Sequence, residues 1–246
     1  MRGIRGGIAV LATAVMLAVS LTGCGEQGPK KDEKPGKASY KSLGALPERL
    51  GNDGTTVVVG DMAAPVAVRL YEDPRCPVCK VFETKGAGPV LREATLQRQT
   101  RTEYTLGSFL DDRLGGSGSK RAVNALRAAL DAGRFAEYHD VLYTHQPEES
   151  VDGYTTARLL ELAGQVEGLR SPAFDAAVKG MKYRDFVTAS QDAMDRERVP
   201  GTPTADVNGV RLRERMGDAL FDGAAFSLLL ATIQDDPEAW RTGADM

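Results

Sequence analysis

Cys76 and Cys79 are separated by only two residues, Pro77 and Val78. A thiol attacks a disulfide only as the thiolate, so a redox cysteine needs a lowered pKa. At a helix start the first sulfur faces unpaired backbone N–H groups and the positive end of the dipole, and a sulfur three residues later lies one turn deeper. The spacing therefore indicates a redox pair, with Cys76 as the exposed attacking thiolate and Cys79 as the resolving thiol.

An inert disulfide and half of a metal site are the alternative uses of this pair. A disulfide that closes so small a ring constrains the unfolded chain very little, so it would be a poor staple. A zinc site normally has four ligands, and only His139 and His145 could join the cysteines. Six residues apart in a helix-like stretch, these histidines would lie on different faces. The sequence therefore predicts no metal and no organic cofactor.

The elements around the pair place it where a strand gives way to a helix. Residues 55–59 are rich in β-branched side chains and residues 66–71 alternate apolar ones, so both are predicted strands. The cysteine pair comes directly after the second strand. A helix follows to about Gln97, with an interruption at Gly86 and Pro89.

The remaining chain is mostly helical up to residue 198, after a third predicted strand at residues 101–109. Apolar residues at three-and-four spacing predict a helix that Ser119 caps and Gly133 ends. Further helices are expected at residues 135–145, at 155–163, from a Ser171 cap onward, and at 183–198. Asn-Gly between residues 204–207 and 210–212 predicts a hairpin, and residues 222–233 predict a closing amphipathic helix.

The Cys-Pro-Val-Cys motif after a strand, the long helical stretch and the Gly-Thr-Pro-Thr segment at 201–204 together resemble DsbA-like members of the thioredoxin superfamily. The resemblance covers residues 55–233, and residues 131–146 are similar to the family's insertion sequence. It implies an α/β thioredoxin-like fold, a central mixed sheet flanked by helices, with a helical insertion domain. It also implies a cis peptide bond at Pro203, facing the cysteines, with the Thr202 backbone free to pair with an extended substrate.

Two departures from the family pattern leave the redox potential open. Val78 stands where strongly oxidising relatives often carry histidine, and it cannot supply a positive charge to the thiolate. The buried acid of related folds would fall on Leu70, which leaves Glu72 as the nearest carboxylate on that strand face. A buried carboxylate there could shuttle protons. The strand-end position favours the alternative that Glu72 and Asp73 are solvated.

The first 23 residues are typical of an export signal, with Arg2 and Arg5 before an apolar stretch of about 14 residues. That stretch is shorter than the roughly 20 residues of a membrane span. Its end resembles the lipobox of bacterial lipoproteins, which implies cleavage before Cys24 and acylation of that residue, with palmitate among the attached chains. An ordinary signal peptide and a transmembrane anchor are the alternatives. The expected location is the extracytoplasmic face of the cell membrane.

The predicted organisation follows from these boundaries: signal peptide 1–23, flexible tether 24–52, thioredoxin-like domain 53–112 and 199–236, inserted helical domain 113–198, C-terminal tail 237–246. The tether is rich in Gly, Pro and Lys and cannot bury enough apolar surface to fold. Removing the leader takes away two arginines, so the formal net charge changes from −3 to −5. No basic stripe is left, and nucleic acid is not expected as a partner.

The predicted function is dithiol oxidation in exported proteins. Substrate thiols would pass electrons to the oxidised pair through a mixed disulfide at Cys76, and a membrane redox partner would recharge it. The same residues would serve a disulfide reductase or isomerase. Two further alternatives use the pair differently: a non-catalytic thioredoxin-fold binding lipoprotein, and a metal chaperone, which the absence of a Met-rich cluster disfavours.

Overall fold

The computed structural model describes residues 38–212, 214–237, 240 and 242, and these residues belong to one compact unit. The predicted signal peptide, Cys24 and tether residues 25–37 lie outside the described residues. None of the helices in the described part has the length and apolar character needed to cross a bilayer.

A six-stranded mixed sheet forms the centre of this unit, in the order β1-β2-β4-β3-β5-β6. The strands β3 and β4 are parallel, and the other neighbours are antiparallel. The strands are β1 (Glu48–Leu50), β2 (Thr56–Gly60), β3 (Val66–Glu72), β4 (Thr100–Leu106), β5 (Thr204–Val207) and β6 (Val210–Arg211). The predicted strands and hairpin are thus confirmed, and β1 was not predicted.

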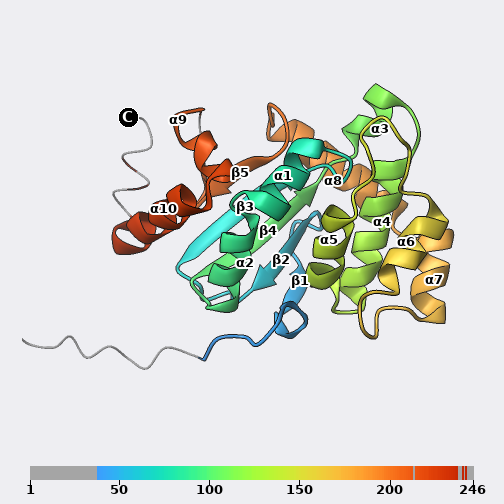
Figure 1. Ribbon diagram of the computed structural model, residues 1–246, viewed down its shortest axis with the longest axis horizontal. Helices are drawn as coiled ribbons and strands as arrows, with labels where there is room; N and C mark the ends of the chain where they lie inside the picture. Colours follow the sequence, from blue (N-terminus) through green and yellow to red (C-terminus); the bar gives the residue numbers. More distant parts are fainter. Residues whose placement is uncertain (1–37, 213, 238–239, 241, 243–246) are drawn as a thin grey trace, which may run out of the picture. The chain divides into compact units, whose positions relative to one another are not determined.

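Helices precede and follow β4 along the chain. Between β3 and β4 lie α1 (Pro77–Lys85) and α2 (Gly88–Leu96); between β4 and β5 lie α3 (Phe109–Leu114), α4 (Gly118–Asp131), α5 (Phe135–Thr144), α6 (Thr156–Ala163), α7 (Pro172–Lys179) and α8 (Arg184–Arg196). The chain ends with α9 (Glu214–Gly217) and α10 (Gly223–Asp235), and short 3-10 turns lie at Leu43–Ala45 and Asp218–Phe221. Figure 1 shows α4 to α7 gathered beside the sheet and α1 and α2 across one of its faces.

The inward face of β3 contributes three apolar side chains and one carboxyl group to the core. Val66, Val68 and Leu70 alternate along this strand and are fully buried. Because side chains on one face of a strand recur every two residues, Glu72 is next in this row, and it is also fully buried. A carboxyl group therefore occupies a core position directly before the cysteine pair.

The predicted break between α1 and α2 has a steric cause. A Cβ at Gly86 would lie 2.5 Å from the Leu220 carbonyl oxygen, and one at Gly88 would lie 2.7 Å from the Glu83 Cα. Only glycine allows backbones to approach so closely. The two glycines thus let the chain turn from α1 into α2 against the segment before α10.

The predicted cap at Ser171 is confirmed, because its hydroxyl accepts from the Phe174 N–H at 3.1 Å. The predicted cap at Ser119 is wrong. The helix α4 begins with Ser117 as the N-cap residue, and the Ser119 hydroxyl donates instead to Asp73 at 2.6 Å. A tertiary partner from another element has replaced the local capping bond.

Residues 38–52 are folded, so the predicted tether boundary at 52 is wrong. The strand β1 pairs with β2, and the Glu48 carboxylate accepts from the backbone N–H groups of Phe135 and Ala136, each at 2.7 Å. Further upstream, the Tyr40 N–H donates to the Leu96 carbonyl at 2.8 Å. Arg98 also donates to the Ala38 carbonyl at 2.7 Å. The chain is therefore fixed to the end of α2 from Ala38 onward.

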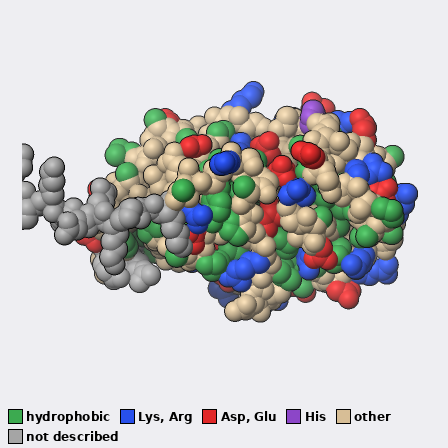
Figure 2. Space-filling model, turned by 90° about the horizontal axis from the view of Figure 1, so that it is seen from below, with side chains coloured by type: hydrophobic (Ala, Val, Ile, Leu, Met, Phe, Trp, Pro, Cys, Tyr) green, Lys and Arg blue, Asp and Glu red, His purple; other side chains and the backbone are tan. Residues whose placement is uncertain are grey.

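Two other predicted boundaries differ from the structure. The third strand ends at Leu106 instead of Phe109, which begins α3, so the boundary at 112 falls inside that helix. In the predicted tail, Trp240 packs against the core and its indole N–H donates to the Val207 carbonyl at 2.9 Å. On the face shown in Figure 2, basic and acidic groups are interspersed.

Candidate active site

The cysteine pair lies where β3 passes into α1, as predicted. Cys76 is the N-cap residue of α1, Pro77 occupies the first turn, and the Cys79 N–H donates to the Cys76 sulfur at 3.4 Å. Both cysteines are free thiols in this structure. Cys76 keeps 6 % of its surface exposed and Cys79 keeps none, so the predicted order of exposure holds although Cys76 is largely covered.

The surroundings of the two sulfurs separate their acidities. Hydrogen bonding from the Cys79 thiol, and then the neighbouring Thr202 and the backbone N–H groups of Cys79 and Val78, lower the pKa of Cys76 to about 6 although the side chain is largely buried. Burial, the neighbouring Cys76 sulfur and the charge of Glu72 raise the pKa of Cys79 well above its usual value. At neutral pH the reduced pair therefore carries one thiolate, on Cys76.

The segment before the hairpin faces Cys76. The Thr202–Pro203 peptide bond is cis, as the resemblance implied. The Cys76 thiol donates to the Thr202 carbonyl oxygen at 3.2 Å, and the buried Thr202 hydroxyl finds no hydrogen-bond partner among the described residues. A thiolate cannot donate, so on ionisation the Thr202 hydroxyl is the group positioned to replace that contact.

The difference in acidity predicts a titration of one sulfur. In the reduced protein the thiolate absorbance near 240 nm should rise with a midpoint near pH 6, because hydrogen bonds stabilise the Cys76 anion. Cys79→Ala should keep a low midpoint but shift it upward, because it removes the side-chain donor that lowers the pKa most. A midpoint above about 8 in the wild-type protein would contradict this assignment.

A buried acid cluster lies beneath the pair. Glu72 Oε2 is 3.0 Å from His139 Nε2, and the ligand-type atoms of Glu72, Glu83 and His139 lie within 4.8 Å of one another. Burial first, and then the charge on the Cys76 sulfur, raises the pKa of Glu72 to about 8. Burial, and then Glu72, raises that of Glu83 to about 8 as well, although Arg92 contacts Glu83 at 2.6 Å.

The structure corrects the interpretation of Glu72 and Asp73 as solvated, because both are fully buried. The two histidines are separated, as predicted: His139 is buried in the acid cluster and His145 is exposed. Burial lowers the pKa of His139, which favours its neutral form. The cluster can therefore hold a proton close to the pair.

The raised pKa of Glu72 predicts a pH-dependent stability. A carboxyl whose pKa is higher in the folded state stabilises it below about pH 4.5, and this contribution is lost as the pH rises through about 8. Between these two pH values the free energy of unfolding falls by about 1.4 kcal/mol per pH unit for each such group. In urea unfolding of the reduced protein from pH 5 to 8, Glu72→Gln should flatten the decline by about that slope. The exposed Glu161→Gln is the control, and equal slopes in Glu72→Gln and wild type would refute the assignment.

Several residues that shape the site were not predicted, and their partners are distant in sequence. Asp73 accepts from the backbone N–H groups of Arg75 and Leu110 at 2.9 and 3.0 Å. Arg75 pairs with Asp111 at 2.8 Å, and both side chains are buried. Gln146 donates to the backbone on both sides of Arg75. Only the place of Arg75 directly before the cysteine motif, and of Gln146 at the end of the insertion-like sequence, hinted at these roles.

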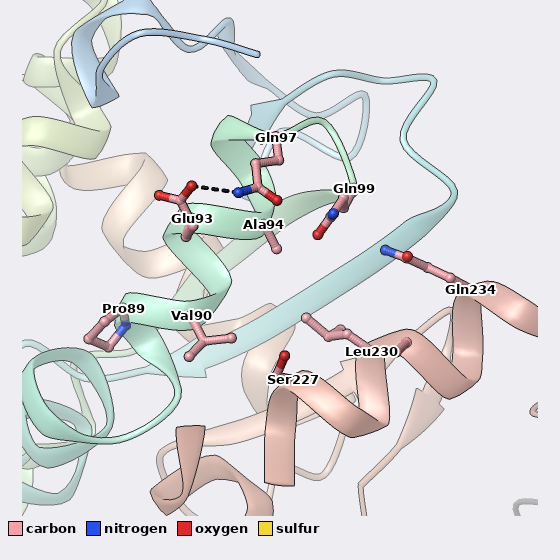
Figure 3. Close-up of a pocket in the computed structure, with 10 residues that line it drawn as sticks. Pro89, Val90, Glu93, Ala94, Gln97, Gln99, Ser227, Leu230 and Gln234 are labelled. Atoms are coloured by element: carbon pink, nitrogen blue, oxygen red, sulfur yellow. Dashed lines mark hydrogen bonds between the residues drawn. The ribbon is translucent and has the colours of Figure 1, made fainter. Parts of the chain in front are cut away.

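One surface hollow lies beside the cysteine pair, and a second, larger one lies away from it. Pro77, Val78, Val81 and Phe221 line an apolar hollow of about 390 Å³ beside Cys76. A larger groove of about 540 Å³ lies between α2 and α10, away from the cysteines, and Figure 3 shows Val90 and Leu230 facing each other across it. The Gln97 amide donates to Glu93 on the α2 side at 2.6 Å, so the polar groups there are partly paired with each other.

Comparison with known proteins places this site in a family. The model of the thioredoxin family matches residues 52–224, which is more than half of the chain. The chain belongs to the thioredoxin family. Its structure is similar to oxidised BdbD of Bacillus subtilis, with a TM-score of 0.63, 18 % identity and coverage of 81 % of this chain and all of the other. The fold implied by the resemblance to DsbA-like proteins is therefore confirmed.

Sequence relatives of this chain include proteins of different kinds and lengths. Disulfide bond formation protein D of Bacillus subtilis is 24 % identical over 153 residues, 61 % of this chain and 67 % of that protein. The Na(+)/H(+) antiporter NhaA 3 of Salinispora tropica is 32 % identical over 159 residues, 63 % of this chain. The chain spans only 22 % of the length of that antiporter, so the match concerns one portion of it.

Proposed function

We propose that this thioredoxin-family chain is a thiol–disulfide oxidoreductase that oxidises dithiols in exported proteins through Cys76. The observation that carries the proposal is the contrast between the two sulfurs: the pKa of Cys76 is lowered to about 6, and that of Cys79 is raised. A stabilised Cys76 thiolate is a good leaving group. The family match and the similarity to disulfide bond formation protein D support this activity.

The reaction balances as two exchanges. A substrate thiolate attacks the Cys76 sulfur of the oxidised pair, the Cys76–Cys79 bond breaks, and Cys79 leaves as a thiolate that takes up a proton. A second substrate thiolate then attacks the substrate sulfur of the mixed disulfide and releases the Cys76 thiolate. The substrate loses two electrons and gains a disulfide, and the pair becomes a dithiol. Glu72 is the candidate proton donor for Cys79.

The acidity of Cys76 favours this direction over reduction. With a pKa of about 6, the thiolate stabilises the reduced protein at pH 7 by roughly 1–2 kcal/mol relative to an ordinary thiol. That energy corresponds to about 30 mV in the reduction potential of a two-electron couple. A more stable reduced form makes the oxidised form a stronger oxidant.

The surface around Cys76 suits an extended, unfolded substrate. Val78, Val81 and Phe221, which line the apolar hollow, are exposed by 45, 45 and 42 %. Exposed apolar groups of this size commonly mark interaction sites. An unfolded exported chain could place apolar side chains there while its backbone pairs with Thr202, next to the cis bond of Pro203.

The sequence pattern supports an extracytoplasmic, membrane-anchored location for this activity. Residues 1–23 would be the removed signal and Cys24 the lipidated residue, and a membrane redox partner would reoxidise the pair. Disulfide formation is a process of oxidising compartments outside the cytosol. Incubation of the producing cells with a labelled fatty acid, with Cys24→Ser as the control, tests the anchor.

The reduction potential tests the direction. The protein would be equilibrated across glutathione buffers and its alkylated thiols counted by mass. A value nearer the roughly −120 mV of DsbA than the roughly −270 mV of thioredoxin supports an oxidase. A value near thioredoxin would instead indicate a reductase or isomerase. A cysteine pair that never exchanges with glutathione would refute the enzymatic function and support the alternative of a non-catalytic binding lipoprotein.

A further inference from the structure

The loop that carries Cys76 is held from outside by the helices inserted between β4 and β5. The Arg75 guanidinium donates to Asp111 and to the Gly115 carbonyl, each at 2.8 Å, and to the Glu149 carbonyl at 3.1 Å. The Ser119 hydroxyl donates to Asp73 at 2.6 Å. The residues directly before the redox motif are thus fixed to a part of the chain that contributes no cysteine.

Gln146 makes the contact nearest to the sulfur. It lies two residues after α5 and is 7 % exposed. Its side-chain amide donates to the Pro74 carbonyl at 2.8 Å and to the Cys76 carbonyl at 2.9 Å. The Lys80 ammonium, on the first turn of α1, donates in return to the Gln146 carbonyl at 3.1 Å. One amide group therefore bridges the peptide units on either side of Arg75.

The orientation of the Cys76 carbonyl determines where the Cys76 sulfur lies at the start of α1. That carbonyl also accepts the Lys80 N–H at 3.2 Å, the bond that begins α1. At this N-cap position the Cys76 sulfur accepts the Cys79 N–H and lies against Thr202. If the peptide unit turned, the sulfur would move away from the Cys79 N–H, although no atom of Gln146 lies among the hydrogen-bond partners of the sulfur.

We propose that Gln146 is a positioning residue for the redox reaction, which holds the backbone of residues 74–76 so that the Cys76 sulfur stays at the helix start. This inference rests on the proposed function and extends it. The helical insertion then does more than cover the sheet: it determines how readily Cys76 forms and releases a mixed disulfide.

The test compares variants that differ in the amide group. Gln146→Met keeps the length and approximate volume and removes both donors, and Gln146→Asn keeps the amide but is too short to reach both carbonyls. Thr144→Ala, at an exposed position in the same helix end, is the matched control. The thiolate absorbance of each reduced protein would be titrated, and the rate of Cys76 alkylation by iodoacetamide at pH 6 would be measured.

Gln146→Met should raise the titration midpoint of Cys76 by at least about 0.5 pH unit and slow alkylation at pH 6 at least about twofold. Gln146→Asn should fall between it and wild type, and Thr144→Ala should match wild type. A Gln146→Met protein with native circular dichroism and an unchanged midpoint would overturn the proposal. If that variant does not fold, Gln146→Asn carries the test, and an unchanged midpoint in Gln146→Asn would overturn the proposal equally.

These readouts need no substrate, so they separate this inference from the proposed function. A protein that exchanges no disulfide with substrates but shows the expected shifts would refute the function and leave the positioning role of Gln146 intact. Normal disulfide exchange without the expected shifts would support the proposed function and refute the positioning role of Gln146.

Discussion

Cys76→Ser should reduce disulfide transfer to the uncatalysed rate, a loss on the order of a thousandfold or more, whereas Cys79→Ser should trap the substrate. A serine hydroxyl forms no disulfide and is not ionised at neutral pH, so no mixed disulfide can arise without Cys76. Cys79 is fully buried beneath it, so a substrate cannot use that sulfur in its place. The two variants therefore separate the two roles.

The measurement is the oxidation of a reduced, unfolded model protein, followed by non-reducing electrophoresis. Cys79→Ser should accumulate a covalent complex with a substrate whose single cysteine is activated as a mixed disulfide with thionitrobenzoate, because the Cys76 thiolate attacks the substrate sulfur and thionitrobenzoate leaves. A reducing agent should release the complex. Cys76→Ser should accumulate none. If the complex formed on Cys79 in the Cys76→Ser protein, the order of attack inferred from burial would be wrong. Disulfide transfer retained without Cys76 would show that the reaction does not pass through this sulfur.

Asp111→Ala should destabilise the folded protein by about 3–5 kcal/mol, because it leaves the buried Arg75 without its counter-ion. Asp111 also accepts the backbone N–H groups of Ser119 and Lys120 at 2.9 and 2.8 Å, so the start of α4 loses two acceptors at once. At roughly 2–4 °C per kcal/mol for a chain of this size, the melting temperature should fall by about 10 °C.

An exposed ion pair supplies the control for this prediction. Arg158 and Glu161 pair at 2.7 Å with side chains exposed by 34 and 65 %, and Glu161→Ala should cost less than about 1 kcal/mol. The double variant Arg75→Met with Asp111→Leu should recover part of the lost stability, because no charge is left buried. A loss of under about 1 kcal/mol in Asp111→Ala would show that Arg75 finds other partners.

The redox pair and the elements around it could be predicted because their signals are local. Two cysteines at this spacing, the alternating β3 sequence and the Asn-Gly hairpin each involve neighbouring residues only. The same holds for the Ser171 cap, where a hydroxyl and the helix start it caps lie three residues apart. Ser119 carries the same local signal, but Asp73 binds its hydroxyl from 46 residues away.

The features that were missed depend on contacts between distant segments. Glu72 is buried because α5 brings His139 to it from 67 residues away. Arg75 is a charged residue of a type that is usually exposed to solvent, yet Asp111 and two carbonyls from the helical insertion enclose it. The short strand β1 is held by pairing with β2 and by the bonds of Glu48 to the start of α5, and its own sequence has little strand character.

Ala38 and Cys76 lie near opposite ends of the parallel strand pair β3 and β4. Ala38 and Tyr40 are bound at the end of α2, just before β4 begins, whereas Cys76 follows the end of the parallel strand β3. Seven paired residues at about 3.3 Å each separate these ends by about 20 Å. With Cys24 as the proposed anchor, the segment from there to Ala38 reaches at most about 50 Å when fully extended. Under the proposed anchoring, this length is the upper limit on the distance between Ala38 and the membrane surface.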